Sequence, residues 1–191
     1  MANSDKRIIK TERLIKKTFI DLLVQKDLSK ITIKEICNIA LISKSTFYDH
    51  YEDKYALLHV LINEYAEQFQ LEVHTRLNLT NSDNDNALQI LTHIIQSVSA
   101  HNKQLSVLLR ESKGADGLET KLRNTLIAEA TTFLSSNHEN KKFSNEFLVK
   151  MYTEITLASL QFALMNYDNS DLLQQQTQFI DMLQKNILLN I

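Results

Sequence analysis

The chain has 191 residues, 43% of them hydrophobic, with no proline, two glycines and a single cysteine, which excludes an intrachain disulfide. Because glycine and proline are the main helix breakers, and because the turns of a sheet protein favour Gly or Asn-Gly, this composition predicts an all-α fold. The net charge is −2, but residues 1–60 carry 11 Lys and Arg against 8 Asp and Glu, whereas residues 61–191 carry 10 against 15, so one end of the molecule is expected to attract a polyanion.

Helical spacing of apolar residues and three capping side chains divide the chain into predicted helices. Thr32 and Glu35 form the Thr-x-x-Glu pattern of a capping box, and Ser43 and Asp53 precede the next two predicted helices. Asp27 to Ser29 form a polar break. About nine helices are predicted, over residues 6–25, 33–40, 44–51, 54–79, 87–100, 103–111, 118–135, 145–167 and 171–189.

The predicted helices 33–40 and 44–51, joined by a tight connection, are arranged as in a DNA-reading helix-turn-helix. The second helix of such a pair enters the major groove, so it must be short and polar on its outward face. We expect its inward face, Phe47 and Tyr51, to pack on Ile36 and Ile39. The outward face carries Lys44, Ser45, Thr46, Tyr48, Asp49 and His50.

The segment ITIKEICNIALISKSTFYDHYEDKYALL, residues 31–58, resembles the DNA-binding domain of the tetracycline-repressor (TetR) family. The matching positions are Thr32, Ile36, Ala40, Ser43, Phe47, Tyr48, Tyr51 and Lys54. The resemblance covers about residues 7–67, and its second half is similar to a subgroup common in Gram-positive bacteria. It implies a DNA-binding domain over residues 1–53 and a helical effector-binding and dimerisation domain over residues 54–191.

The family pattern also implies roles for individual side chains. Lys44, Ser45 and Thr46 are expected to contact base edges, and the other members of the set to contact phosphates or cap helices. The whole predicted DNA-binding set is Thr32, Ser43, Lys44, Ser45, Thr46, Tyr48, His50 and Lys54. Two residues depart from expectation: Leu41 stands where the family commonly has glycine, and Asp49 places a carboxylate near phosphates.

The last two predicted helices are apolar on wide faces, which form either intramolecular core or a four-helix dimer interface. The resemblance implies a homodimer on a palindromic operator that a small-molecule effector controls. Candidate interface residues are Met151, Ile155, Phe162, Phe179, Leu183 and Ile187. Candidate effector-pocket residues are Tyr65, Phe69, His101, Leu105, Leu108, Tyr152 and Phe162.

The sequence gives little support for an enzyme, a metal-binding protein or a membrane protein. There is no glycine-rich phosphate loop, His-Glu-x-x-His or nucleophile elbow, so we expect no catalytic residues and no enzyme. His93 and His101 are too widely spaced to chelate a metal on one helix turn, and neither a metal nor a cofactor is expected. No apolar run approaches the roughly 20 residues of a membrane span, and the N-terminus lacks a signal-peptide core, which predicts a cytoplasmic protein.

Three functional alternatives stay open at this point. The chain is a repressor released by its effector, an activator or co-regulator of the same fold, or a helical interaction protein that does not bind DNA. The outward donors Lys44, Tyr48 and Lys54 favour DNA binding, because a degenerate motif would not keep donors at the phosphate positions.

Overall fold

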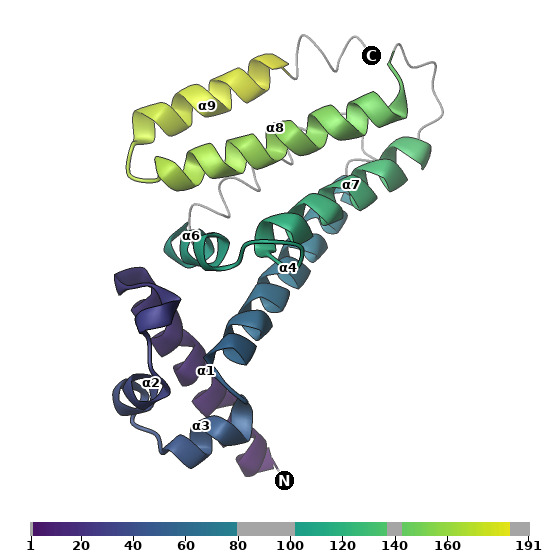
Figure 1. The fold of residues 1–191 in the computed structure, drawn as a ribbon. Helices are drawn as coiled ribbons and strands as arrows, with labels where there is room; N and C mark the ends of the chain where they lie inside the picture. Colours follow the sequence, from purple (N-terminus) through teal and green to yellow (C-terminus); the bar gives the residue numbers. More distant parts are fainter. Residues whose placement is uncertain (1, 80–101, 137–142, 184–191) are drawn as a thin grey trace.

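The computed structural model describes residues 2–79, 102–136 and 143–183, and within these ranges every regular element is helical (Figure 1). The helices are α1 (Ala2–Gln25), the 3-10 turn η1 (Leu28–Lys30), α2 (Ile33–Ala40), α3 (Lys44–His50), α4 (Lys54–Leu79), α6 (Asn102–Glu111), α7 (Leu118–Ser136), α8 (Asn145–Met165) and α9 (Ser170–Leu183). The predicted bounds are confirmed to within about four residues wherever the structure describes both ends. The predicted helix over 87–100 lies outside the described residues. No described helix is both long and apolar enough to cross a bilayer.

The helices are arranged along one long axis (Figure 1). Helices α1, α2 and α3 gather at one end of the molecule, where the N-terminus also lies, and α8 and α9 lie at the opposite end. Helix α4 runs from the first end along α7, and α7 packs in turn on α8. Helix α4 therefore links the helix-turn-helix to the rest of the chain, and α6 adds a second link because it packs on α1.

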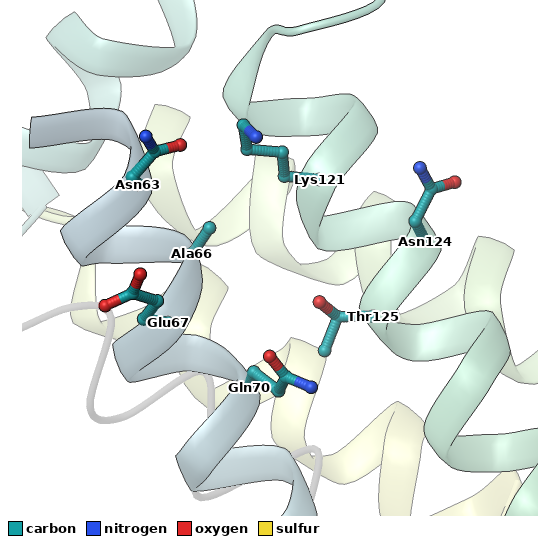
Figure 2. A pocket seen from close by; sticks show the side chains of 7 residues that line it. All are labelled: Asn63, Ala66, Glu67, Gln70, Lys121, Asn124 and Thr125. Carbon is teal, nitrogen blue, oxygen red and sulfur yellow. The ribbon is translucent and has the colours of Figure 1, made fainter. Parts of the chain in front are cut away.

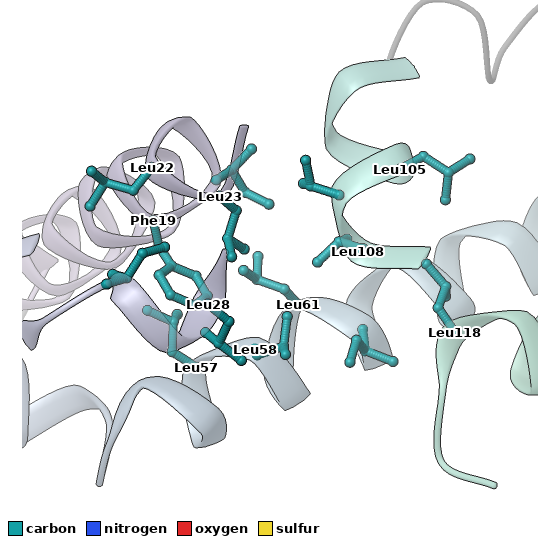
Figure 3. Close-up of a cluster of buried hydrophobic side chains, with 14 of the residues drawn as sticks. Phe19, Leu22, Leu23, Leu28, Leu57, Leu58, Leu61, Leu105, Leu108 and Leu118 are labelled. Atoms are coloured by element: carbon teal, nitrogen blue, oxygen red, sulfur yellow. The ribbon is translucent and has the colours of Figure 1, made fainter. Parts of the chain in front are cut away.

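One hydrophobic core runs through both ends of the molecule. Phe19 of α1, Leu57 of α4 and Leu108 of α6 are completely buried in the same cluster (Figure 3). Each fully buried side chain of this kind contributes roughly 1.5–3 kcal/mol. Because the packing continues across residue 53, the division into domains 1–53 and 54–191 stays a prediction.

The connection between α1 and α2 differs from the expected polar break. It forms the turn η1, and Leu28 at its start is only 8% exposed and belongs to the core. The Leu28 amide lies 3.3 Å from Glu111 Oε2 on α6, to which it donates a hydrogen bond. Arg110, beside Glu111, donates to the carbonyl of Leu23 at the end of α1 at 2.7 Å. The end of α6 thus holds this connection in place.

The turn between α2 and α3 begins with Leu41 in the left-handed conformation, with φ 53° and ψ 43°. An L-residue with a Cβ pays about 1–2 kcal/mol in this region, whereas glycine enters it without steric cost. The Leu41 amide closes the helix by donating to Cys37 O, and Ile42 donates to the same oxygen at 3.0 Å. Leu41 accepts the strained turn rather than changing it.

We expect Leu41→Gly to raise the free energy of unfolding by about 0.5–1 kcal/mol, because it relieves the left-handed strain while adding some freedom to the unfolded chain. The Leu41 side chain is 90% exposed, so its removal loses little packing. The measurement is the urea midpoint at unchanged m-value. Leu41→Ala, which keeps the Cβ, is the control and should show no such gain. A lower midpoint for Leu41→Gly would contradict the strain at this turn.

Candidate nucleic-acid interface

The three capping side chains at the first end of the molecule are confirmed. Thr32 Oγ1 accepts from the amide of Glu35 at 3.2 Å, and Ser43 Oγ accepts from that of Thr46 at 3.0 Å. Asp53 Oδ1 accepts from two amides at the start of α4, at 2.8 and 2.7 Å. The carboxylate of Glu35 binds Lys26, the residue directly after α1, at 2.6 Å. In a full capping box this carboxylate would instead accept from the backbone amide of Thr32. This ion pair ties α2 to α1.

Helix α3 is amphipathic, and one buried side chain holds it against the rest of the protein. Phe47 is 0% exposed and is the only buried residue of the helix. Its ring packs edge-on against the ring of Tyr48, and its ring centroid lies 5.9 Å from that of Tyr51. Tyr51 follows the helix and is also buried, as predicted. Ile39 was expected beside them, but this prediction is wrong, because Ile39 is 56% exposed. Helix α2 buries Ile36, Cys37 and Ala40 instead.

The outward face of α3 matches the prediction. Tyr48 is 54% exposed, Lys44, Ser45 and Asp49 are exposed, and Thr46 and His50 are half-buried. The hydroxyls at the start of the helix bind one another, since Ser43 Oγ lies 2.8 Å from Ser45 Oγ and 2.9 Å from Thr46 Oγ1. Each hydroxyl has one hydrogen and two lone pairs, so the cluster keeps capacity for further hydrogen bonds while its orientation is already set.

A shallow hollow of about 430 Å³ lies where the first turns of α2 and α4 meet the start of α3. It is lined by Ile31, Thr32, Ile33, Lys34, Lys44, Asp53, Lys54 and Tyr55. Lys34 is exposed and was not among the predicted DNA-binding residues. Its position in the second residue of a capped helix was the available signal. Lys34 and Lys44 are the exposed cations of this lining, which also includes the carboxylate of Asp53 and apolar side chains.

The structure places Lys54 differently from the expectation that it donates to DNA. Its ammonium donates to three backbone carbonyls, those of Leu28 and Ile31 at 2.8 Å and that of Ser29 at 3.3 Å. These are carbonyls of η1 and of its C-cap, and Leu28 O also accepts the amide of Ile31 at 3.1 Å. The three donors of an ammonium are thereby used, so Lys54 holds α4 to the connection that precedes α2.

A charged cluster holds the other end of α3. Lys16 of α1 binds both Glu12 of α1 and Glu64 of α4, and the Tyr51 hydroxyl lies 3.5 Å from Glu12 Oε1. The hydrogen bond from Lys16 holds the pKa of the Glu12 carboxyl below its ordinary value, and burial raises the pKa of Tyr51 to about 12. The cluster therefore stays charged at neutral pH, with Tyr51 as a neutral donor, and fixes α3 against α1 and α4.

The predicted pocket residues are not gathered around one described cavity. Phe69, Leu105 and Leu108 are buried in the core, whereas Phe162 is 39% exposed on the outer face of α8. The Tyr65 hydroxyl donates to Gln104 Oε1 at 3.2 Å. His101 lies outside the described residues. A hollow of about 280 Å³ between α4 and α7 has a different, polar lining of Asn63, Ala66, Glu67, Gln70, Lys121, Asn124 and Thr125 (Figure 2).

Two buried polar groups on α8 stand out in the described part of the chain. The hydroxyls of Tyr152 and Thr153 are buried without a hydrogen-bond partner there. Burial raises the pKa of Tyr152 to about 12, so this hydroxyl stays protonated and remains a donor at neutral pH. Buried hydroxyls without a hydrogen-bond partner are rare in native structures.

Helix α8 has two apolar faces. One is buried and includes Val149, Leu157 and Leu160. The opposite face carries large apolar side chains that remain exposed or half-buried in the single chain, namely Phe147, Met151, Ile155, Phe162 and Met165. Helix α9 lies beside α8, held by Gln176 Nε2, which donates to Ser159 O at 2.7 Å. Phe179 of α9 is exposed as well. The side chain of Leu183 and the whole of Ile187 lie outside the described part.

No protein-family model matches the chain. Over 86 residues it is 34% identical to the uncharacterized HTH-type transcriptional regulator YxbF of Bacillus subtilis (strain 168), and the aligned segment is 44% of this chain and 22% of that relative. The chain thus spans less than a quarter of the curated relative that it matches.

Two solved structures are similar over almost the whole chain. One is a TetR transcriptional regulator from Streptococcus agalactiae 2603V, with a TM-score of 0.60 and 23% identity over 94% of this chain and 98% of that one. The other is the fatty acid degradation regulator FadR from Bacillus halodurans, with a TM-score of 0.69 and 14% identity over 93% and 96%. At such identities the likeness concerns the fold, and it confirms the predicted architecture of an N-terminal helix-turn-helix followed by a helical body.

Proposed function

Because the chain has the fold of the TetR-family transcriptional regulators, we propose that it is a sequence-specific DNA-binding regulator that represses transcription from a palindromic operator. The observation that carries this proposal is the build of α3, which is anchored by Phe47 and presents Lys44, Ser45 and Tyr48 to solvent. The relative of Bacillus subtilis is described as an HTH-type transcriptional regulator, which supports the same function.

In the proposed complex α3 lies in the major groove. Lys44 donates to the O6 and N7 acceptors of guanine, and the hydroxyls of Ser45 and Thr46 bind neighbouring base edges. The Tyr48 hydroxyl and the ring of His50 donate to backbone phosphates, and Lys34 joins them from α2. Lys54 acts as a positioning residue, because its donors are already bound to the carbonyls of η1.

A palindromic operator requires two copies of the chain, and the exposed apolar face of α8, with Phe179 of α9, is the surface that we assign to the homodimer. Two helices from each protomer would form a four-helix bundle and remove Met151, Phe162 and Met165 from water. This surface lies at the opposite end of the molecule from α3 (Figure 1). The dimer therefore sets the separation of the two recognition helices, about 34 Å or a multiple of it.

The repressor is released, in this proposal, by a small molecule bound in the helical body. The unpartnered hydroxyls of Tyr152 and Thr153 support such a site, since a polar group of the effector would satisfy them. Helix α4 links the body to α3, so a shift of α4 changes the spacing of the recognition helices and with it the operator affinity. Activation through the same fold is the alternative that a transcription assay distinguishes.

The test starts from a DNA duplex selected by the protein from a randomised pool. We expect Tyr48→Phe to weaken binding about fivefold to tenfold on every sequence, because it removes one phosphate donor. Lys44→Gln should weaken binding about tenfold on the selected sequence and relax the preference at one base pair of each half-site. The measurement is the Kd by fluorescence anisotropy.

Lys113→Gln, which removes an exposed charge remote from α3, is the matched control and should leave the Kd unchanged. If the wild-type protein retains no duplex even at low salt, the regulator proposal fails and a helical interaction protein takes its place. Unchanged affinity in both the Tyr48 and the Lys44 variants would refute the assigned contacts.

A further inference from the structure

We infer that the first turns of α1 form a second DNA-binding surface, in which Lys6, Arg7 and Lys10 bind phosphates beside the bases that α3 reads. The inference rests on the proposed function and extends it beyond the helix-turn-helix. The sequence pattern of the recognition segment, residues 31–58, does not include these side chains.

The position of α1 brings these cations to the correct end of the molecule. Glu12 of α1 lies beside the end of α3, 3.5 Å from the Tyr51 hydroxyl. Lys6 precedes Glu12 by six residues, which is about 9 Å along the helix axis. Figure 1 shows the N-terminus of α1 at the same end of the molecule as α3 and away from α8 and α9. A duplex seated against α3 therefore has its flanking backbone near the first turns of α1.

The charge of this surface has no acidic counterpart among the described side chains. Lys6, Arg7 and Lys10 are exposed, and the ion pairs between described side chains do not include them. The next lysine on the same helix behaves differently, since Lys16 binds Glu12 and Glu64. Among the described side chains, α1 therefore pairs its charge at Lys16, beside α4, and not at Lys6, Arg7 or Lys10.

The spacing of these cations is unfavourable for an isolated helix. Lys6 and Lys10 are four residues apart, as are Arg13 and Lys17, and all four are exposed. Like charges at this spacing lie on the same face and destabilise a helix by about 0.2–0.5 kcal/mol for each pair. Attraction to the phosphates of a polyanion offsets this repulsion, and each phosphate that a lysine neutralises also releases a condensed counterion. Charge complementarity therefore selects DNA as the occupant.

The experiment compares salt dependence on two duplexes, the selected operator alone and the operator with about ten extra base pairs on each side. The variant Lys6→Gln/Lys10→Gln should lower the slope of log Kd against log salt on the long duplex by about 2, because each phosphate contact contributes about 0.9. Its base preference in a selection should stay that of the wild type. The wild-type protein should also bind the long duplex more tightly than the short one.

The control is Lys103→Gln/Lys113→Gln, which removes the same total charge at exposed positions in and just after α6, away from α3 (Figure 1). It should leave the slope within about 0.5 of the wild-type value. Far-UV circular dichroism checks that both variants are folded. An equal slope for the wild type and Lys6→Gln/Lys10→Gln overturns this inference while the proposed function stands. Equal losses in both double variants overturn it too, since they indicate net charge alone. Absence of wild-type binding overturns both proposals.

Discussion

Phe47→Ala should lower the free energy of unfolding by about 3–5 kcal/mol and abolish operator binding. Phe47 is completely buried and is the only buried residue of the seven-residue helix α3. A helix of this length is not stable on its own in water, so its order depends on this tertiary contact. With a total stability of about 5–15 kcal/mol for a domain, the loss is large enough to unfold part of the population. Urea denaturation measures the first effect and fluorescence anisotropy the second.

Phe47→Leu separates packing from chemistry at this position. It keeps most of the apolar volume, so we expect a loss below about 2 kcal/mol and retention of operator binding. Amide hydrogen exchange adds a local readout, because the α3 amides of Phe47→Ala should exchange at rates near those of an unfolded segment. Protected α3 amides or wild-type affinity in Phe47→Ala would show that α3 has another anchor.

Lys54→Met should lower the free energy of unfolding by about 2 kcal/mol. The ammonium of Lys54 donates to the carbonyls of Leu28, Ser29 and Ile31, and methionine keeps most of the aliphatic stem but no donor. Hydrogen bonds from a charged group contribute roughly 1.5–3 kcal/mol each when buried, and less here because the site is only partly buried. Carbonyls that reach water after the substitution recover part of the loss, which leaves a net effect near 2 kcal/mol.

The same variant distinguishes the positioning role of Lys54 from the phosphate contact that the family resemblance implies. A lost phosphate contact lowers the slope of log Kd against log salt by about 0.9 at unchanged stability. A positioning residue lowers stability and affinity and leaves the slope unchanged. We expect the second pattern. Lys34→Gln, at an exposed lysine of the same hollow, should show the first pattern and serves as the comparison.

Local sequence was sufficient to predict the described helices, their caps and the helix-turn-helix. Thr32, Ser43 and Asp53 each accept an amide hydrogen bond two or three residues later, and such contacts depend only on local sequence. Helical periodicity likewise predicted that Phe47 and Tyr51 face inward. These features follow from interactions over one helix turn, which is why a single sequence was sufficient to predict them.

The partner of several other side chains depends on tertiary packing and could not be predicted from local sequence. Leu28 reads as part of a polar break, but it is buried, and its amide binds Glu111, 83 residues later in the chain. The sequence predicts Lys54 as a phosphate donor, but its ammonium binds the carbonyls of Leu28 and Ile31, which precede it in the chain by more than 20 residues. The sequence predicts Ile39 as a core residue, but α2 packs through Ile36, Cys37 and Ala40 and leaves Ile39 exposed to solvent. In each case the choice depends on which distant element packs nearby, and local periodicity contains no information about that element.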